Sequence, residues 1–295
     1  MNTIKRLFLL FLIFFSGAAF AQQTGKVIEE LYVKSDILNR NVKYAVYLPA
    51  DYETSNRTYP VVYLLHGYGD DHTGWLQFGE VNRYADKAIA DGTIPPMIIV
   101  MPDAGTSWYI NNYNGKQSYE DFFFKEFIPT IETEYRIKNK KQYRGVAGLS
   151  MGGYGTLVYS IKHPDMFSAA AALSAAVRSD DDFMAITEAR WKEAYSNVIG
   201  PNLNGKERLN ATWQANSVLG MVQSKTADDL KNVRLWLDCG DDDALSKGNI
   251  LLHIALTEKK VPHEFRIRDG AHTWTYWRTG IVDALAFIGD SFRQK

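Results

Sequence analysis

A serine flanked by glycines gives the strongest chemical signal in this chain. Ser150 lies between Gly148 and Gly152 in the pattern G-x-S-x-G, and residues 143–147 and 154–162 predict a strand before it and a helix after it. A sharp strand-to-helix turn strains the serine backbone and leaves no room for bulky residues two positions away. The alternative is a glycine-rich turn with an incidental serine. The flanking strand and helix favour a nucleophile.

A nucleophilic serine needs a base, and the base needs an acid that orients it. This turn usually occurs with the chain order Ser, Asp, His, and His272 fits that order because it follows the last predicted strand. The acid is one of Asp241, Asp242 and Asp243, beyond the strand predicted over residues 233–237; the residues alone leave the choice open. Asp238 continues that strand and is expected to end it.

The other histidines fit the role of the base less well. They are predicted to lie in a helix, before a strand, at a helix end or in early loops (His253, His263, His163, His66 and His72). For His66 we expect a structural hydrogen bond rather than proton transfer.

Predicted strands and helices alternate along the chain, which indicates right-handed crossovers and a mostly parallel sheet with helices on both faces. The predicted strands cover residues 27–33, 42–48, 61–65, 97–101, 143–147, 167–176, 233–237 and 264–267. The predicted helices cover residues 78–90, 119–134, 154–162, 247–259 and 276–292, the second of them bent at Pro129. Residues 178–231 show weak periodicity and are predicted to form an inserted region over the strand ends, within one α/β domain over residues 22–295.

Composition narrows the classes of partner. The chain has 295 residues, 46% of them hydrophobic, and a net charge of −1, so neither nucleic acid nor an anionic membrane is expected as its main partner. Neither a P-loop nor a G-x-G-x-x-G fingerprint occurs, and we expect no cofactor. The acidic run 241–243 lacks the ligand spacing of a calcium loop, so we expect no metal. Cys239 is the single cysteine, which excludes an intramolecular disulfide.

The first 21 residues have the composition of a secretory signal peptide. Lys5 and Arg6 precede the apolar run 7–15, and Ala19-Phe20-Ala21 matches an A-x-A cleavage pattern. We expect cleavage after Ala21 and a periplasmic or secreted mature protein. The alternative is an uncleaved N-terminal anchor, although the run is short for a transmembrane helix.

Four motifs resemble the putative-esterase (esterase D-like) family of α/β-hydrolases. They are LHG at 65–67, GLSMGG at 148–153, CGDDD at 239–243 and GAHTW at 270–274. The family includes feruloyl and acetylxylan esterases of carbohydrate esterase family 1, S-formylglutathione hydrolases and mycolyltransferases. The resemblance covers residues 42–287. It implies an α/β-hydrolase fold, Asp243 as the acid, and the backbone N–H groups of Met151 and Tyr68 as donors to an oxyanion.

Aromatic residues near the expected site are candidates for substrate binding. The loop 107–113 follows a strand and contains Trp108 and Tyr109, whose rings suit stacking on sugar or phenolic groups. Trp274 lies two residues after His272 in the fourth motif. The alternative for the loop is packing in the core.

Together these features predict a secreted serine ester hydrolase with a Ser150–His272–Asp243 triad and an acyl-enzyme intermediate. The expected substrates are feruloyl or acetyl esters of polysaccharide. One alternative is a thioesterase like S-formylglutathione hydrolase or a general short-chain esterase. Others are a peptidase and a non-catalytic binding module on a hydrolase fold.

Overall fold

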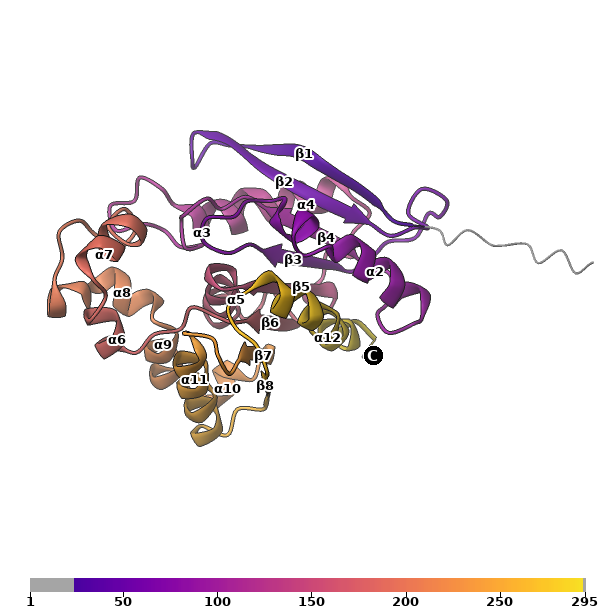
Figure 1. Ribbon diagram of the computed structural model, residues 1–295. Coiled ribbons are helices and arrows are strands. Elements are labelled where there is room, and N and C mark those ends of the chain that lie inside the picture. Colours follow the sequence, from indigo (N-terminus) through magenta and orange to yellow (C-terminus); the bar gives the residue numbers. More distant parts are fainter. Residues whose placement is uncertain (1–23, 294–295) are drawn as a thin grey trace, which may run out of the picture.

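One eight-stranded sheet runs through residues 24–293, the part of the chain that this computed structural model describes (Figure 1). The strands lie in the order β1-β2-β4-β3-β5-β6-β7-β8. The signal peptide expected over residues 1–21 lies outside the described residues.

The first edge of the sheet is antiparallel. β1 (Lys26–Ser35) pairs with β2 (Arg40–Leu48), and β2 pairs antiparallel with β4 (Ile98–Pro102). β1 and β2 thus form a hairpin, from the two strands predicted at residues 27–33 and 42–48. Its four-residue turn ends at Asn39, which adopts a left-handed φ of 49° that asparagine tolerates better than most residues.

The rest of the sheet is parallel and confirms the predicted sheet type. It comprises β3 (Val61–Leu65), β4, β5 (Arg144–Leu149), β6 (Ala169–Leu173), β7 (Arg234–Gly240) and β8 (His263–Arg268). β3, β4 and β6 are buried along their whole length, as expected of continuous apolar runs covered on both faces. β6 is shorter than the predicted strand 167–176. Ser174 ends it, because its φ of 45° turns the following chain out of the strand, while its N–H still donates to the carbonyl of Asp238.

Helices cover both faces. One face packs against α5 (Met151–Lys162), α11 (Ser246–Glu258) and the helical segment α3 (Tyr119–Phe122), η1 (Phe123–Phe127) and α4 (Ile128–Glu134). The other packs against α1 (Gly74–Gln77), α2 (Val81–Ala90) and α12 (Trp274–Arg293). The helix predicted over residues 119–134 contains a π-helical turn just before Pro129, in which the Ile128 N–H donates to the Phe123 carbonyl. The short helix η2 (Lys141–Tyr143) leads into β5.

Residues 178–231 fold as short helices, of which α6–α8 form a lobe at one end of the sheet in Figure 1, whereas α9 and α10 lie beside α11. The helices are α6 (Asp180–Met184), α7 (Glu188–Ala194), η3 (Gly205–Arg208), α8 (Ala211–Asn216), α9 (Val218–Ser224) and α10 (Ala227–Leu230). The loops after β3 and β4 bond to this region: the Tyr68 hydroxyl donates to the Glu193 carbonyl (2.9 Å) and Trp108 Nε1 to the Ala194 carbonyl (2.8 Å). The part of the region around α7 therefore lies at the carboxyl ends of the parallel strands, whereas α9 packs against α5 and α11, and α10 leads into the amino end of β7. Among residues 24–293, no helix has the length and apolarity needed to cross a membrane.

Candidate active site

The turn between β5 and α5 places Ser150 at the carboxyl edge of the sheet. Ser150 has φ 53° and ψ −113°, so the predicted strained turn is present. A Cβ on Gly152 would lie 2.4 Å from the Leu65 carbonyl oxygen, and one on Gly148 would lie 2.6 Å from the Gly152 backbone. Glycine is therefore required at both positions by close backbone approach.

Ser150, His272 and Asp243 are joined by two short contacts. Nε2 of His272 lies 2.9 Å from Ser150 Oγ, and Nδ1 of His272 lies 2.8 Å from Asp243 Oδ2. Asp243 follows β7 and His272 follows β8, so neighbouring strands deliver the two side chains to the serine. This arrangement can pass a proton from the hydroxyl to the imidazole while the carboxylate fixes the ring.

The surroundings of Asp243 keep its carboxyl group ionised. Burial raises its pKa, but hydrogen bonds from His272 and from the Leu245 N–H (2.8 Å) outweigh burial, and the net pKa is below the ordinary value. The Asp243 side chain is fully covered, whereas the His272 side chain is 36% exposed. The base, His272, is therefore accessible to solvent, whereas the carboxylate of Asp243 that binds it is buried.

Asp238 has a different partner. Its two oxygens each lie 2.9 Å from the Arg268 guanidinium, and the Tyr276 hydroxyl also donates to it. Because Asp238 is almost fully buried, this pairing offsets its desolvation. The bidentate pair links β7 to β8 and is structural, in line with the expected role at the strand end.

Asp241 and Asp242 are exposed and do not bond to His272. Asp241 Oδ1 accepts hydrogen bonds from the backbone N–H groups of Gly270 (3.0 Å) and Asp242 (3.1 Å). Carboxylate oxygens of Asp241, Asp242 and Asp269 lie within 4.8 Å of one another at the surface. Of the three candidate acids, the structure brings Asp243 to the imidazole.

The two residues expected to supply oxyanion donors belong to segments that adjoin Ser150. Met151 is the first residue of α5, so its N–H has no carbonyl one turn earlier to accept it. The loop after β3 adjoins the serine, because a Cβ on Gly67 would lie 3.7 Å from Ser150 Cβ. Tyr68 is the next residue of that loop. Donors from two elements on one side of a nucleophile can stabilise an oxyanion.

His66 holds that loop in place. The Ala104 N–H donates to Nε2 of His66 (2.9 Å), so the ring proton is on Nδ1, which lies 2.8 Å from the Gly67 carbonyl oxygen. His66 is buried. Both ring nitrogens are engaged by the backbone, which agrees with the structural role expected for this histidine.

Two residues that sequence reasoning missed surround the His272–Asp243 pair. Trp277 lies edge-on to His272, with ring centroids 4.8 Å apart, and its Nε1 donates to Ser174 Oγ (3.0 Å). The Ser174 hydroxyl in turn helps to lower the pKa of Asp243. Ser174 has a signal in the sequence, since it is the first polar residue after an apolar strand. Trp277 has none, because helix contacts alone bring it there.

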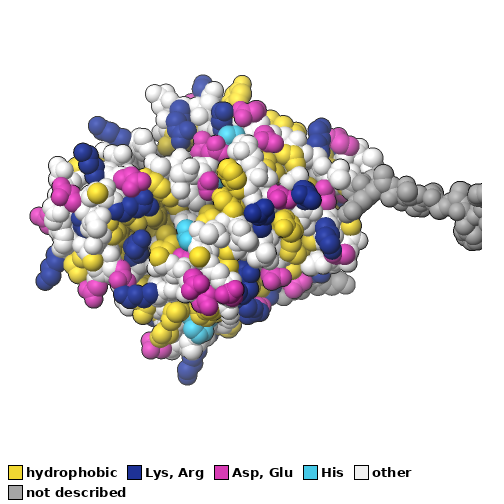
Figure 2. Space-filling view, viewed as in Figure 1, with side chains coloured by type: hydrophobic (Ala, Val, Ile, Leu, Met, Phe, Trp, Pro, Cys, Tyr) yellow, Lys and Arg dark blue, Asp and Glu magenta, His cyan; other side chains and the backbone are white. Residues whose placement is uncertain are grey.

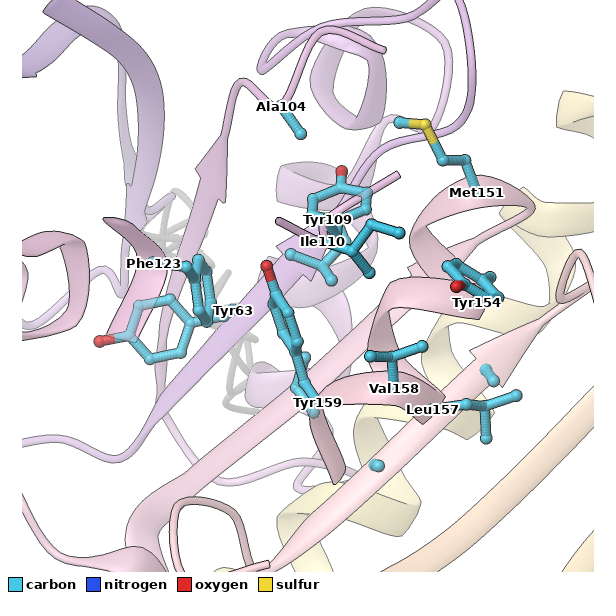
Figure 3. Close-up of a cluster of buried hydrophobic side chains, with 14 of the residues drawn as sticks. Tyr63, Ala104, Tyr109, Ile110, Phe123, Met151, Tyr154, Leu157, Val158 and Tyr159 are labelled. Atoms are coloured by element: carbon cyan, nitrogen blue, oxygen red, sulfur yellow. The ribbon is translucent and has the colours of Figure 1, made fainter. Parts of the chain in front are cut away.

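The substrate-binding prediction for Tyr109 is wrong. Tyr109 is fully buried, its hydroxyl donates to the His66 carbonyl (3.0 Å), and its ring fills the space left by the missing side chain of Gly155. Figure 3 shows it among the core side chains that include Tyr154 and Tyr159.

Trp108 also packs inward. Only 6% of it is exposed, and its ring stacks on Tyr195 with centroids 4.7 Å apart. The aromatic cavity that it lines has a volume of about 10 Å³, room for about one water molecule. The structure therefore corrects the prediction of an open stacking surface: Trp108 joins the inserted region to the sheet.

Trp274 is half-buried and remains the most accessible of the three predicted aromatic residues. Its ring meets Trp75, Phe78 and Trp277 at centroid distances of 5.3, 5.8 and 5.3 Å. Trp277 contacts both Trp274 and His272 and so lies between them. In Figure 2 a histidine side chain is visible between the α6–α8 lobe on the left and the body of the sheet.

Comparison with known proteins places the chain among esterases. The family model described as "Putative esterase" matches residues 35–288. Esterase MT1326 of Mycobacterium tuberculosis is 31% identical over 247 residues, which cover 78% of this chain and 52% of that relative. An endo-1,4-beta-xylanase/feruloyl esterase of Xylanibacter ruminicola is 39% identical over 129 residues, 41% of this chain and 18% of that protein. The chain thus spans about half the length of the first relative and less of the second.

A solved structure of a ferulic acid esterase is similar over nearly the whole chain. It has a TM-score of 0.77 and 35% sequence identity, and the match covers 91% of this chain and 100% of that one. The predicted α/β-hydrolase fold class is confirmed.

Proposed function

Because the chain belongs to the "Putative esterase" family, we propose that it hydrolyses carboxylic esters with Ser150 as the nucleophile, His272 as the base and Asp243 as the orienting acid. One observation carries the proposal: the unbroken series of contacts from Asp243 Oδ2 to His272 (2.8 Å) and from His272 to Ser150 Oγ (2.9 Å). A binding module would have no need of this series, which argues against the non-catalytic alternative.

The reaction follows from the roles of these groups. Ser150 Oγ attacks the ester carbonyl as its proton passes to His272 Nε2, and the N–H groups of Met151 and Tyr68 hold the oxyanion. The carbonyl reforms as the ester C–O bond breaks, and the imidazolium returns the proton to the leaving alcohol. Water then gives a proton to His272 and attacks the acyl-enzyme. The acyl–Oγ bond breaks, the acid leaves, and the imidazolium returns its proton to Ser150 Oγ. Asp243 stabilises the imidazolium in both halves.

For the substrate we propose feruloyl or acetyl esters linked to polysaccharide. The 35% identity to a ferulic acid esterase and the similarity to a xylanase/feruloyl esterase support this class. The half-buried Trp274 offers an aromatic surface near His272. The alternative is a thioesterase or a general short-chain esterase.

A panel of substrates tests this choice. We expect kcat/KM for methyl ferulate or acetylated xylan to exceed that for S-formylglutathione by about tenfold or more, which corresponds to about 1.4 kcal/mol of transition-state binding. The Ser150→Ala variant serves as the blank for each substrate. The reverse ranking would overturn the polysaccharide-ester assignment and favour the thioesterase, without touching the proposed triad.

We also propose that the protein is exported and begins at Gln22 after signal cleavage, on the strength of the basic, apolar and A-x-A segments of residues 1–21. The intact mass of protein recovered from the periplasm or the medium should equal that of residues 22–295. A mass that includes Met1 would contradict cleavage.

A further inference from the structure

A polar cleft lies between the inserted region and the segment that follows Asp243. Its volume is about 340 Å³, within the range of small-molecule pockets. Three cations, Arg178, Arg190 and Lys247, and one acid, Asp182, lie on its walls. In Figure 2, Lys and Arg side chains gather on the α6–α8 lobe facing the hollow.

The cleft begins next to the proposed catalytic residues. Leu245, on one wall, donates its N–H to Asp243 Oδ1 (2.8 Å). Arg178, on another, comes two residues after Ala176, whose N–H donates to the Ser150 carbonyl (3.0 Å). The cleft thus adjoins the segments that carry Ser150 and Asp243, and a group bound there can belong to a substrate whose ester lies at Ser150.

The charges in the cleft do not cancel. Lys247 pairs with Asp182 (2.6 Å), and Arg190 pairs with Glu193 (3.1 Å). Arg178 differs, since no carboxylate of residues 24–293 lies within 4.0 Å of its guanidinium nitrogens. Its Nε is buried and has no hydrogen-bond partner there. A buried guanidinium N–H without an acceptor is costly, and the other interactions of Arg178 are with the Tyr195 hydroxyl and, beyond ion-pair distance, with Asp182. Because the side chain as a whole is half-buried and lines the cleft, an anion bound there would supply the carboxylate partner that the described residues do not.

We propose that this cleft binds a carboxylate that the substrate carries away from its scissile ester, with Arg178 as the principal partner. The inference rests on the function proposed above and deepens it. A guanidinium presents parallel N–H donors that match the two oxygens of a carboxylate. Arg190 and Lys247 add positive potential at the rim. The substrate class is thus an ester of an acidic molecule, such as an acetylated uronic-acid saccharide or a dicarboxylic acid monoester.

Two matched pairs of esters test the proposal and locate the carboxylate. One pair, mono-p-nitrophenyl succinate and p-nitrophenyl butyrate, differs by a carboxylate on the acyl side. The other, the acetyl esters of methyl glucuronoside and methyl glucoside, differs by a carboxylate on the alcohol side. For at least one pair, Arg178→Gln should lower the charged-to-neutral ratio of kcat/KM at least about tenfold.

Matched variants separate charge from folding. Arg178→Lys, which keeps the charge, should retain part of that ratio, and Lys247→Gln should lower it less than Arg178→Gln does. Arg83→Gln removes an exposed cation on α2, far along the chain from the cleft, and should leave the ratio unchanged. Added salt should reduce the ratio in the wild type. A ratio that Arg178→Gln leaves unchanged in both pairs would overturn the proposal.

A binding measurement keeps this result distinct from failure of the esterase proposal. In the Ser150→Ala background, titration calorimetry with the charged ester should give a dissociation constant at least about tenfold higher once Arg178→Gln is added. Equal dissociation constants would overturn the carboxylate site, whether or not the wild type hydrolyses the ester. Binding that depends on Arg178, without hydrolysis by the wild type, would support the site and contradict the proposed catalysis.

Discussion

Replacing Ser150 with alanine is expected to reduce kcat for ester hydrolysis by on the order of 10³-fold or more. Alanine keeps the strained turn and its close glycine contacts but removes the atom that forms the acyl-enzyme. The remaining residues, among them the oxyanion donors, can then act only on direct attack by water. The measurement is the steady-state hydrolysis of p-nitrophenyl acetate, corrected for the uncatalysed rate.

Ser160→Ala is the matched control for this variant. Ser160 lies on α5, the helix that follows Ser150. It is buried, and its hydroxyl donates to the Leu157 carbonyl (3.0 Å), away from the site. Its loss should leave kcat nearly unchanged. If Ser150→Ala and the wild type hydrolysed the ester at equal rates, the proposed nucleophile would have to be abandoned.

Replacing Asp243 with asparagine is expected to lower kcat by as much as about 10⁴-fold while the protein remains folded. The carboxylate accepts a hydrogen bond from Nδ1 of His272 and so leaves Nε2 free to take the serine proton. An asparagine amide can donate to Nδ1 instead and select the opposite tautomer. The loss should appear mainly in kcat, because Asp243 is buried beneath the histidine and does not contact substrate.

Asp242→Asn tests the choice of acid. It makes the same chemical change one residue earlier, on an exposed side chain that does not bond to His272. Its kcat should stay within a few-fold of the wild type, and circular dichroism should show both variants folded. A large loss in Asp242→Asn, with Asp243→Asn active, would show that the acid had been assigned to the wrong residue of the turn.

The sheet was predictable because strands that are buried on both faces consist of consecutive apolar residues. The prediction for β3 matches its bounds, and the strands beside it differ by a few residues. β6 was predicted too long because alanine and valine continue past Leu173. Backbone geometry at Ser174, which composition does not reveal, ends the strand.

The sequence predicted an inserted region over residues 178–231 but not the bounds of its helices. These helices begin at polar N-caps such as Ser179, Thr187 and Asn210. Each has so few turns that its apolar residues do not show a helical period in the sequence. Tyr109 was misassigned for a similar reason. A loop rich in aromatic residues suggests a binding surface, and only the gap at Gly155 shows that its ring belongs to the core.

The residues of the site differ in how far the sequence determined them. Ser150 and His272 followed from local pattern and chain order. Asp243 needed the family resemblance, because three consecutive aspartates are equivalent until the turn after β7 fixes which one points inward. Arg178 offered no motif, because only the folded structure shows that no carboxylate of residues 24–293 lies within 4.0 Å of its guanidinium.

The bonds that tie the loops after β3 and β4 to the end of α7 have a consequence for how this enzyme scaffold can vary. The Tyr68 hydroxyl and the Trp108 indole attach to consecutive carbonyls, those of Glu193 and Ala194. The residue whose backbone is proposed to hold the oxyanion is therefore anchored by its own side chain to the region that frames the substrate. The same hydrogen bonds therefore affect both substrate binding and the position of the oxyanion donor. Any change that moves the end of α7 also moves the loop that carries Tyr68, so the inserted region cannot be exchanged without affecting the reaction rate.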